Sequence, residues 1–218
     1  MIPTSEVFEL IAALMLFVAI WAQVGSFVLS KIQVIIIQTT LLSIYTVLLG
    51  IYESSIALIV LAILIIFLRG VVTAYILLRK FPERSQLVRE SSTTVPSIII
   101  LSIGVIIVSL VVYQIALFPV IQSLPDSVQR IANPPIIALG FVIAIQGFLL
   151  IATRKNKVTQ FTGYIEIENA MVLLSLGIFP LPLVIEISVL LDVLALVIVG
   201  SVLLSGSLNS ERLEDLTG

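Results

Sequence analysis

Runs of about 20 apolar residues, the length that an α-helix needs to cross a bilayer, follow one another along most of this chain. None of these runs alternates between apolar and polar residues as the strands of a membrane β-barrel do. The pattern predicts an all-α integral membrane protein, a bundle of about seven transmembrane helices. The expected spans are Val7–Leu29, Ile32–Ile51, Ile56–Leu78, Pro96–Gln122, Pro134–Ala152, Val158–Phe179 and Leu183–Leu204.

Polar and proline-containing breaks divide the chain. A charged connector begins at Arg79, Asn133-Pro134-Pro135 precedes the fifth span, and Pro180-Leu181-Pro182 forces a tight reversal. We therefore expect an N-terminal four-helix unit over residues 1–130, a three-helix module over 131–204 and a polar tail over 205–218. The first span begins with Glu6 and Glu9 and lacks a basic leader, so it does not look like a cleaved signal peptide.

Basic residues gather in alternate connectors, and the positive-inside rule assigns such connectors to the cytoplasm. If seven spans start with the N-terminus outside and end with the C-terminus in the cytoplasm, nine basic residues lie inside and only Arg130 lies outside. The nine are Lys31, Arg79, Lys80, Arg84, Arg89, Arg154, Lys155, Lys157 and Arg212. This asymmetry favours both the orientation and the number of spans.

The amino-acid composition excludes several classes of protein and of functional site. The 218 residues are 60% hydrophobic and only 11% charged, and the mean hydropathy is +1.26. A soluble domain of this size has about 45–50% apolar residues. The 13 acidic and 11 basic residues give no basic excess that would suggest nucleic-acid binding. Cysteine and histidine are both absent, which excludes disulfides, thiolate and imidazole metal sites and a Ser-His-Asp triad.

Five charged residues fall inside expected spans: Arg69, Glu166, Glu168, Glu186 and Asp192. A charge at the centre of a span costs about 2.5–3.5 kcal/mol on insertion scales, and such residues often mark an ion or proton path. Arg69 lies roughly 13 Å from the inner end of its span, at a rise of 1.5 Å per residue. It is either a structural arginine paired with a carboxylate or carbonyls, or a fixed charge that tunes neighbouring acids.

The sixth span carries a polar stripe. Lys157, Gln160, Tyr164 and Glu168 recur on one helical face that runs from the inner surface to the membrane centre. A stripe that ends in a buried carboxylate is typical of a proton half-channel, although it also fits a polar contact between helices. Glu166 projects about 200° away from Glu168, so the two acids do not line one path together.

The last span adds Glu186, near its outer side, and Asp192, near its middle. Burial of a carboxyl group in a low dielectric brings proton exchange toward physiological pH, so acids are plausible proton carriers in a chain without histidine. Neutral polar groups that could hold water between these sites are Tyr113, Gln114, Gln146 and Asn169.

The last three spans resemble the small K subunit of respiratory complex I. That subunit has a basic-basic-Asn turn, then a Gly-x-Glu-x-x-x-Asn segment, then a last helix with a buried glutamate. Here the turn is Arg154-Lys155-Asn156, the segment is Gly163-Tyr164-Ile165-Glu166-Ile167-Glu168-Asn169-Ala170, and Glu186 follows Pro182-Leu183-Val184-Ile185. The chain is about twice as long as that subunit, with four additional spans in front.

The whole chain resembles the hydrogenase-4 component E family, an extended relative of the K subunit. The family pattern Gly-Tyr-x-x-x-Glu-Asn corresponds to Gly163, Tyr164, Glu168 and Asn169, and Leu183–Ile187 with Asp192 matches its last helix. The N-terminal half fits more loosely, with Gln38 before Thr39-Thr40-Leu41 and with Arg69 in the third span. This chain has Ile165 at the position of the K-subunit glutamate. The pattern of the extended family assigns the role of that glutamate to Glu168 first, and Glu166 is an additional acid in this chain.

The resemblance implies a subunit of a group 4 membrane-bound hydrogenase or formate hydrogenlyase-like complex in a prokaryotic cytoplasmic membrane. Its partners would be antiporter-like subunits, a quinone-chamber-like subunit and membrane lipid. The chain would hold no cofactor, and nickel–iron and iron–sulfur centres would lie in partner subunits. Not an enzyme on its own, it would contribute Glu168, Glu186 and Asp192 to a proton or sodium path that Arg69 modulates.

Three other functions stay open. The chain could be a scaffold that joins larger membrane subunits of the same kind of complex, with its buried acids as contacts between helices. A free-standing transporter is less favoured, because the sequence shows no symmetric halves. An intramembrane enzyme lacks any nucleophile–base pair that the sequence brings together.

Overall fold

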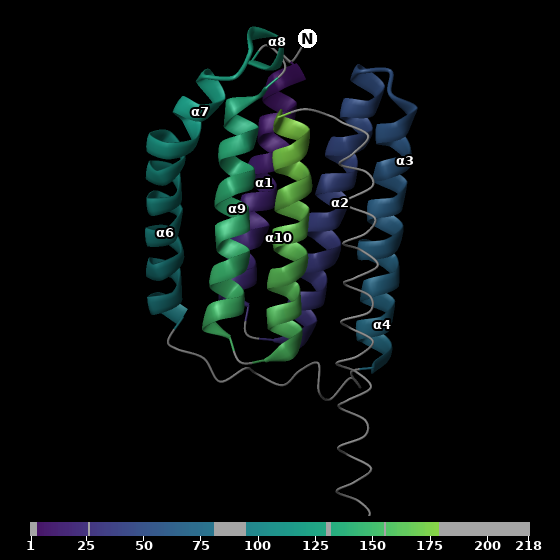
Figure 1. Cartoon of the computed structure of the whole chain (residues 1–218). Coiled ribbons are helices and arrows are strands. Elements are labelled where there is room, and N and C mark those ends of the chain that lie inside the picture. The colour runs from purple at the N-terminus through teal and green to yellow at the C-terminus, as the bar shows by residue number, and fades with distance from the viewer. Residues whose placement is uncertain (1–3, 26, 81–94, 130–131, 155, 179–218) are drawn as a thin grey trace, which may run out of the picture.

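A computed structural model describes residues 4–25, 27–80, 95–129, 132–154 and 156–178 of the chain (Figure 1). The expected seventh span, Leu183–Leu204, lies outside the described residues, as do Glu186, Asp192 and the polar tail. The described part is helical and contains no β-strand.

The described elements are α1 (Thr4–Val24), α2 (Val28–Tyr52), α3 (Ile56–Ile65), η1 (Ile66–Val72), α4 (Thr73–Lys80), α6 (Val95–Val112), η2 (Tyr113–Leu117), α7 (Phe118–Gln122), α8 (Asp126–Gln129), α9 (Pro134–Thr153) and α10 (Lys157–Ile178). The elements η1 and η2 are π-helical segments that continue the helices before and after them. Pro119 explains η2, because a proline inside a helix disturbs the hydrogen bonding of the preceding turn.

Five helical stretches are long and apolar enough to cross a membrane, which confirms that this is a helical membrane protein. They are Ser5–Val24, Val28–Tyr52, Ile56–Arg79, Pro96–Gln122 and Pro134–Thr153. These stretches match the first five expected spans to within five residues at each end. The sixth expected span is the 22-residue helix α10, which is not among the five and which carries three charged residues.

The first break in the chain differs from the prediction. The expected first span extended to Leu29, but α1 ends at Val24 and α2 already begins at Val28. The turn between them is tight, since a Cβ atom added at Gly25 would lie 2.7 Å from Oγ of Ser30. Lys31, expected in the connector, therefore lies in the first turn of α2.

The helices form a bundle in which α9 and α10 are an antiparallel pair (Figure 1). α10 also packs against α2, and α1 packs against both α2 and α9. The unit α3–η1–α4 covers α2 on one side, while α6 covers α9 and α1 on the other. α9 and α10 thus lie between the two outer units, so polar side chains of α10 are shielded from the surroundings.

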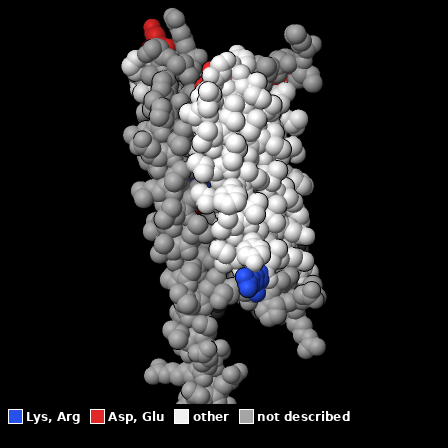
Figure 2. All heavy atoms as spheres, turned by 90° about the vertical axis from the view of Figure 1, so that its right-hand side faces the viewer, with Lys and Arg blue, Asp and Glu red and all other residues white. Residues whose placement is uncertain are grey.

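Charge is divided between the two ends of the bundle. We call one end the basic end, because the described basic residues there are Lys31, Arg79, Arg154 and Lys157. The opposite end carries the described acids Glu6, Glu9, Glu53 and Asp126. Figure 2 shows the outer face of α3–η1–α4, where basic atoms lie near one end, acidic atoms near the other, and neither sign covers the long middle.

Small residues let α9 and α10 approach closely. A Cβ atom added at Gly147 would lie 2.7 Å from the backbone oxygen of Gly163, and one added at Gly163 would lie 2.8 Å from that of Gly147. Gly140 and Gly177 have similar backbone contacts with the facing helix. Backbone-to-backbone packing of this kind is typical of membrane helices.

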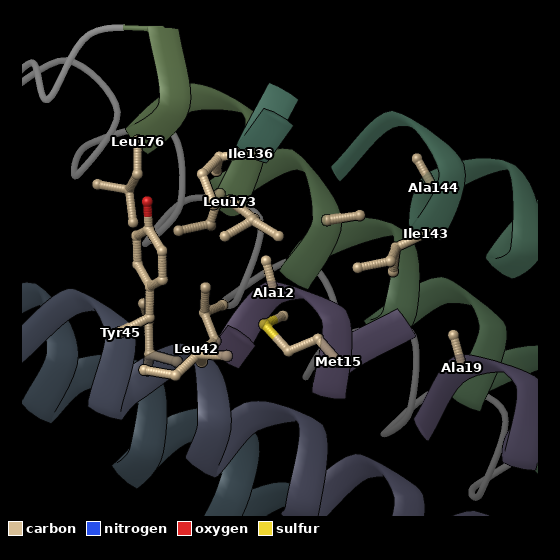
Figure 3. Close-up of a cluster of buried hydrophobic side chains, with 14 of the residues drawn as sticks. Ala12, Met15, Ala19, Leu42, Tyr45, Ile136, Ile143, Ala144, Leu173 and Leu176 are labelled. Atoms are coloured by element: carbon tan, nitrogen blue, oxygen red, sulfur yellow. The ribbon is translucent and has the colours of Figure 1, made fainter. Parts of the chain in front are cut away.

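The main apolar core joins five helices, α1, α2, α3, α9 and α10, near the acidic end (Figure 3). Its buried side chains include Met15 of α1, Leu42 of α2, Ile136 of α9 and Leu173 of α10. Large apolar side chains also cover the outside, among them Phe17, Ile56, Phe67 and Ile100. An apolar exterior around an apolar core is what a bilayer, rather than water, requires of a helix bundle.

Candidate functional site

Arg69 is held inside the bundle by an irregular stretch of helix. It lies in the π-helical segment η1 and only 1% of its surface is exposed. The backbone N–H of Thr73 donates to the backbone oxygen of Leu68, five residues earlier, and the hydroxyl of Thr73 donates a second hydrogen bond of 3.0 Å to the same oxygen. π-Segments often occur at functional positions, because they redirect side chains relative to a regular helix.

The guanidinium of Arg69 faces two neighbouring residues of α10. Its Nε lies 3.7 Å from Oε2 of Glu168, and Glu168 is only 3% exposed. Its Nη1 donates a 3.0 Å hydrogen bond to Oδ1 of Asn169. The expected intramembrane arginine and the carboxylate at the end of the polar stripe thus form an ion pair.

Asn169 extends this pair to α2. Its side-chain nitrogen donates to Oε1 of Gln38 and to Oγ1 of Thr39, each at 3.3 Å. Gln38, Thr39 and Asn169 are all fully buried. We call Arg69, Glu168, Asn169, Gln38 and Thr39 together the Arg69 network. It joins η1, α2 and α10 and brings residues of the N-terminal half of the chain next to residues of the C-terminal half.

The predicted stripe on α10 becomes more buried along the helix. Lys157 is exposed at the basic end, and Gln160, one turn further in, is half-buried and donates a 2.8 Å hydrogen bond to the backbone oxygen of Arg154. Tyr164 stacks on Phe161 and has a buried hydroxyl. Glu168 then lies in the Arg69 network, so the four residues lead from the basic end to the ion pair.

Glu166 occupies a different surrounding. It is 1% exposed, and neither of its carboxylate oxygens has a hydrogen-bond partner among the described residues. The positive charge of Lys31 on α2 acts on this carboxylate. Glu166 thus lies outside the Arg69 network, in agreement with the different directions of the two glutamates around the helix.

Lys31 itself is buried to 99% and donates a short hydrogen bond to the backbone oxygen of Ala22 near the end of α1. The expectation that Lys31 is a connector residue is therefore wrong. Arg154, expected in the polar turn, is also buried, and its Nη2 donates to the backbone oxygen of Gln23. Both side chains bind carbonyls in the last turn of α1, where free carbonyls favour cations.

A second polar network, which we call the glutamine network, joins α1, α9 and α6. Nε2 of Gln23 donates a 2.7 Å hydrogen bond to the backbone oxygen of Gln146. Ser102 and Gln146 then exchange two hydrogen bonds, at 2.9 Å and 3.0 Å. Gln146, expected to hold water near the acids, instead binds α6 to α9.

Two other expected polar groups lie away from these networks. The hydroxyl of Tyr113 donates a 2.9 Å hydrogen bond to the backbone oxygen of Pro134, and Gln114 is exposed. Within the described ranges, no three acidic residues gather in a way that could hold a metal ion. The described site contains the buried charged residues Arg69, Lys31, Glu166 and Glu168, together with neutral hydrogen-bonding groups.

Sequence reasoning missed Lys31, Arg154, Gln23 and Ser102 as buried polar residues. Lys31 and Arg154 lie at helix ends, where a basic residue usually reaches water. One signal was present for Gln23, since a glutamine inside an apolar run needs a hydrogen-bond partner in the membrane. Comparison of the chain with protein-family models, with curated proteins and with solved structures found no match in any of the three.

Proposed function

We propose that this chain is a membrane-arm subunit of a complex I-like respiratory or group 4 hydrogenase complex. It contributes buried carboxylates to a proton or sodium path that is coupled to redox chemistry in other subunits. In this proposal the chain has seven spans, with the N-terminus outside and the C-terminus in the cytoplasm of a prokaryotic cell. Its partners are antiporter-like and quinone-chamber-like membrane subunits, and the nickel–iron and iron–sulfur centres lie in partner subunits of the complex.

The observation that supports this function best is the Arg69 network. A buried arginine cannot lose its proton under physiological conditions, so Glu168 is the member of the ion pair that can exchange one. The amide and hydroxyl groups of Asn169, Gln38 and Thr39 can reorient to accept and donate hydrogen bonds beside it. A titratable group beside a fixed charge, deep inside a helix bundle, is the arrangement that ion paths use.

The division of charge between the two ends of the bundle supports the orientation. The positive-inside rule assigns the basic end, with Arg79 and Lys157 on its surface, to the cytoplasm. The stripe from Lys157 through Gln160 and Tyr164 would then lead from the cytoplasm to Glu168. Glu186 and Asp192 would continue the path in the last span.

The test combines isolation and transport. Affinity purification of the tagged chain from its native membrane should bring down antiporter-like and hydrogenase-like subunits. In vesicles that contain this complex, Glu168→Gln should preserve assembly and electron transfer but reduce redox-driven proton or sodium movement by about tenfold or more, as expected for loss of an acid–base group. Glu53→Gln, a change of an exposed glutamate outside the spans, is the matched control. Normal ion movement in Glu168→Gln would overturn the proposal.

A scaffold that joins larger subunits is the second candidate. The glutamine network and the glycine contacts between α9 and α10 favour it, because both fix the positions of helices without any titratable group. For a scaffold, Glu168→Gln should reduce assembly of the complex, and ion movement per assembled complex should stay unchanged. In Glu168→Gln, a proton-path subunit should therefore lose ion movement, whereas a scaffold should lose assembly of the complex.

A further inference from the structure

The surroundings of Glu166 require an explanation that the Arg69 network does not provide. Both carboxylate oxygens are buried and have no hydrogen-bond partner within the described part of the chain. A bare carboxylate inside a protein is costly, and it lowers its energy either by taking up a proton or by approaching a cation. Lys31 of α2 is a candidate cation for Glu166, and water at the basic end of the bundle is a candidate source of the proton.

Lys31 has two possible acceptors. Its ammonium group donates to the backbone oxygen of Ala22, and its charge also acts on Glu166. Side chains of a helix lean toward its N-terminus. Because α2 and α10 both begin at the basic end, the side chains of Lys31 and Glu166 both lean toward that end. A flexible four-carbon stem lets a lysine exchange one acceptor for another without movement of the backbone.

Apolar clusters lie next to both residues along the chain. One cluster, between α1, α2 and α9, contains Ala22, whose backbone oxygen binds Lys31, and Val34, three residues after Lys31. A second cluster, of α2, α4 and α10, contains Ile32 and Ile165, the chain neighbours of Lys31 and Glu166. The low dielectric of such surroundings strengthens an interaction between two charges.

The other charged groups near α10 have partners of their own. From η1, Arg69 faces Glu168 and Asn169. From the end of α9, Arg154 binds the backbone of Gln23 in α1. Among the described residues, Lys31 of α2 is thus the cation that acts on Glu166.

We propose that Glu166 and Lys31 form a second proton-binding site, between the basic end of the bundle and the Arg69 network. Glu166 is about 13 Å along α10 from its first residue and Glu168 about 16 Å, at 1.5 Å per residue. A proton from water at the basic end forms an O–H bond with Glu166, and the ammonium of Lys31 rests on Ala22. When that O–H bond breaks and the proton leaves, the ammonium moves to the carboxylate. No electron is transferred in either step.

This site deepens the proposed function, because it would hold a second proton in the same helix as Glu168, but proton binding at Glu166 does not depend on redox-driven transport. It is therefore tested on the full-length chain, purified with whatever subunits accompany it and placed in lipid nanodiscs. Infrared difference spectroscopy across a pH titration follows the C=O stretch of protonated carboxylic acids. The variants are Glu166→Gln, Lys31→Met, Lys31→Arg and Arg79→Met, the last being a change of an exposed basic residue at the same end.

The proposal expects one pH-dependent carboxylic acid band to disappear in Glu166→Gln. In Lys31→Met this band should persist to higher pH by about one unit or more, the effect of an opposite charge near a carboxylate. Lys31→Arg should keep most of the original behaviour, and Arg79→Met all of it. Identical titrations of the original chain and Glu166→Gln would overturn the proposal.

If Glu166→Gln does not fold, the infrared titrations of the Lys31 variants test the proposal instead. Equal titrations in Lys31→Met and Arg79→Met would overturn the site, and a selective shift in Lys31→Met would support it. Absence of these infrared changes would show that Glu166 and Lys31 do not form the site. It would not affect the transport test of Glu168. Conversely, a chain that belongs to no redox complex would still show the band of Glu166.

Discussion

Nε of Arg69 lies 3.7 Å from Oε2 of Glu168, and both side chains are almost completely buried. The two residues belong to different halves of the chain and to different helices, η1 and α10. A buried ion pair of this kind rarely adds stability over a well-packed apolar pair, but loss of one partner is strongly destabilising. Replacement of one partner alone should therefore weaken the fold more than replacement of both.

Replacement of Arg69 by methionine should destabilise the bundle. The change leaves the Glu168 carboxylate buried without its cation and removes a hydrogen bond to Asn169, at a cost of about 3–5 kcal/mol if the carboxylate stays ionised. Unfolding of the purified chain in mixed detergent micelles measures this loss. Arg79→Met, at an exposed position, should change the stability by less than about 1 kcal/mol. Adding Glu168→Leu to Arg69→Met should restore part of the stability, and a further decrease would contradict this account.

The glutamine network should couple α6 to α9. Gln146→Leu removes both of its side-chain hydrogen bonds with Ser102, and Ser102→Ala removes the hydroxyl that donates one of them. Hydrogen bonds between membrane helices contribute about 0.6 kcal/mol each on average and up to about 1.7 kcal/mol. A double-mutant cycle of the two changes should give a coupling energy in this range. Additive effects would show that the contact does not hold the two helices together.

The glycine contacts between α9 and α10 should tolerate no side chain. Gly163→Leu places a side chain where even a Cβ would lie 2.8 Å from the backbone oxygen of Gly147, so the helices must separate. We expect a loss of several-fold in folded yield and a lower midpoint of thermal unfolding. Gly104→Ala is the matched control, since a Cβ added there meets no atom within 4 Å and alanine favours a helix. Equal yields for both variants would contradict the close approach.

Glu53, in the turn between α2 and α3, should give the folded chain a small pH dependence. Burial of its carboxyl group raises the pKa of Glu53 above its ordinary value. The folded chain then binds more protons than the unfolded chain between the two pKa values, so stability falls as pH rises through this window. NMR titration of the labelled carboxyl carbon measures the pKa directly. Glu53→Gln should remove this part of the pH dependence of unfolding, and an ordinary pKa would contradict the prediction.

Hydropathy located the first five spans because their length and apolar character are set by the bilayer. The same hydropathy pattern placed the boundary between the first and second spans several residues too late. Gly25 ends α1 through a tight turn against Ser30, a local contact that hydropathy does not report. As a result Lys31 was assigned to a connector, although it is a buried cation within α2.

Charge and periodicity identified the ion pair only in part. The cost of a charge in a membrane singled out Arg69 and Glu168 separately, and helical spacing placed Glu168 at the end of a polar stripe. The contact between them depends on how η1 packs against α10, which no local pattern determines. The bond of Gln38 with Asn169 likewise depends on packing between α2 and α10.

The distance along the chain between Arg69 and its partners has a consequence for biosynthesis. Arg69 and Asn169 are 100 residues apart in the sequence, so the third span leaves the ribosome well before α10 exists. At roughly 5–20 residues per second, the delay is about 5 to 20 seconds. During this time Arg69 lacks both Glu168 and Asn169. The third span therefore stays in the membrane through the apolar character of its other residues until α10 completes the Arg69 network.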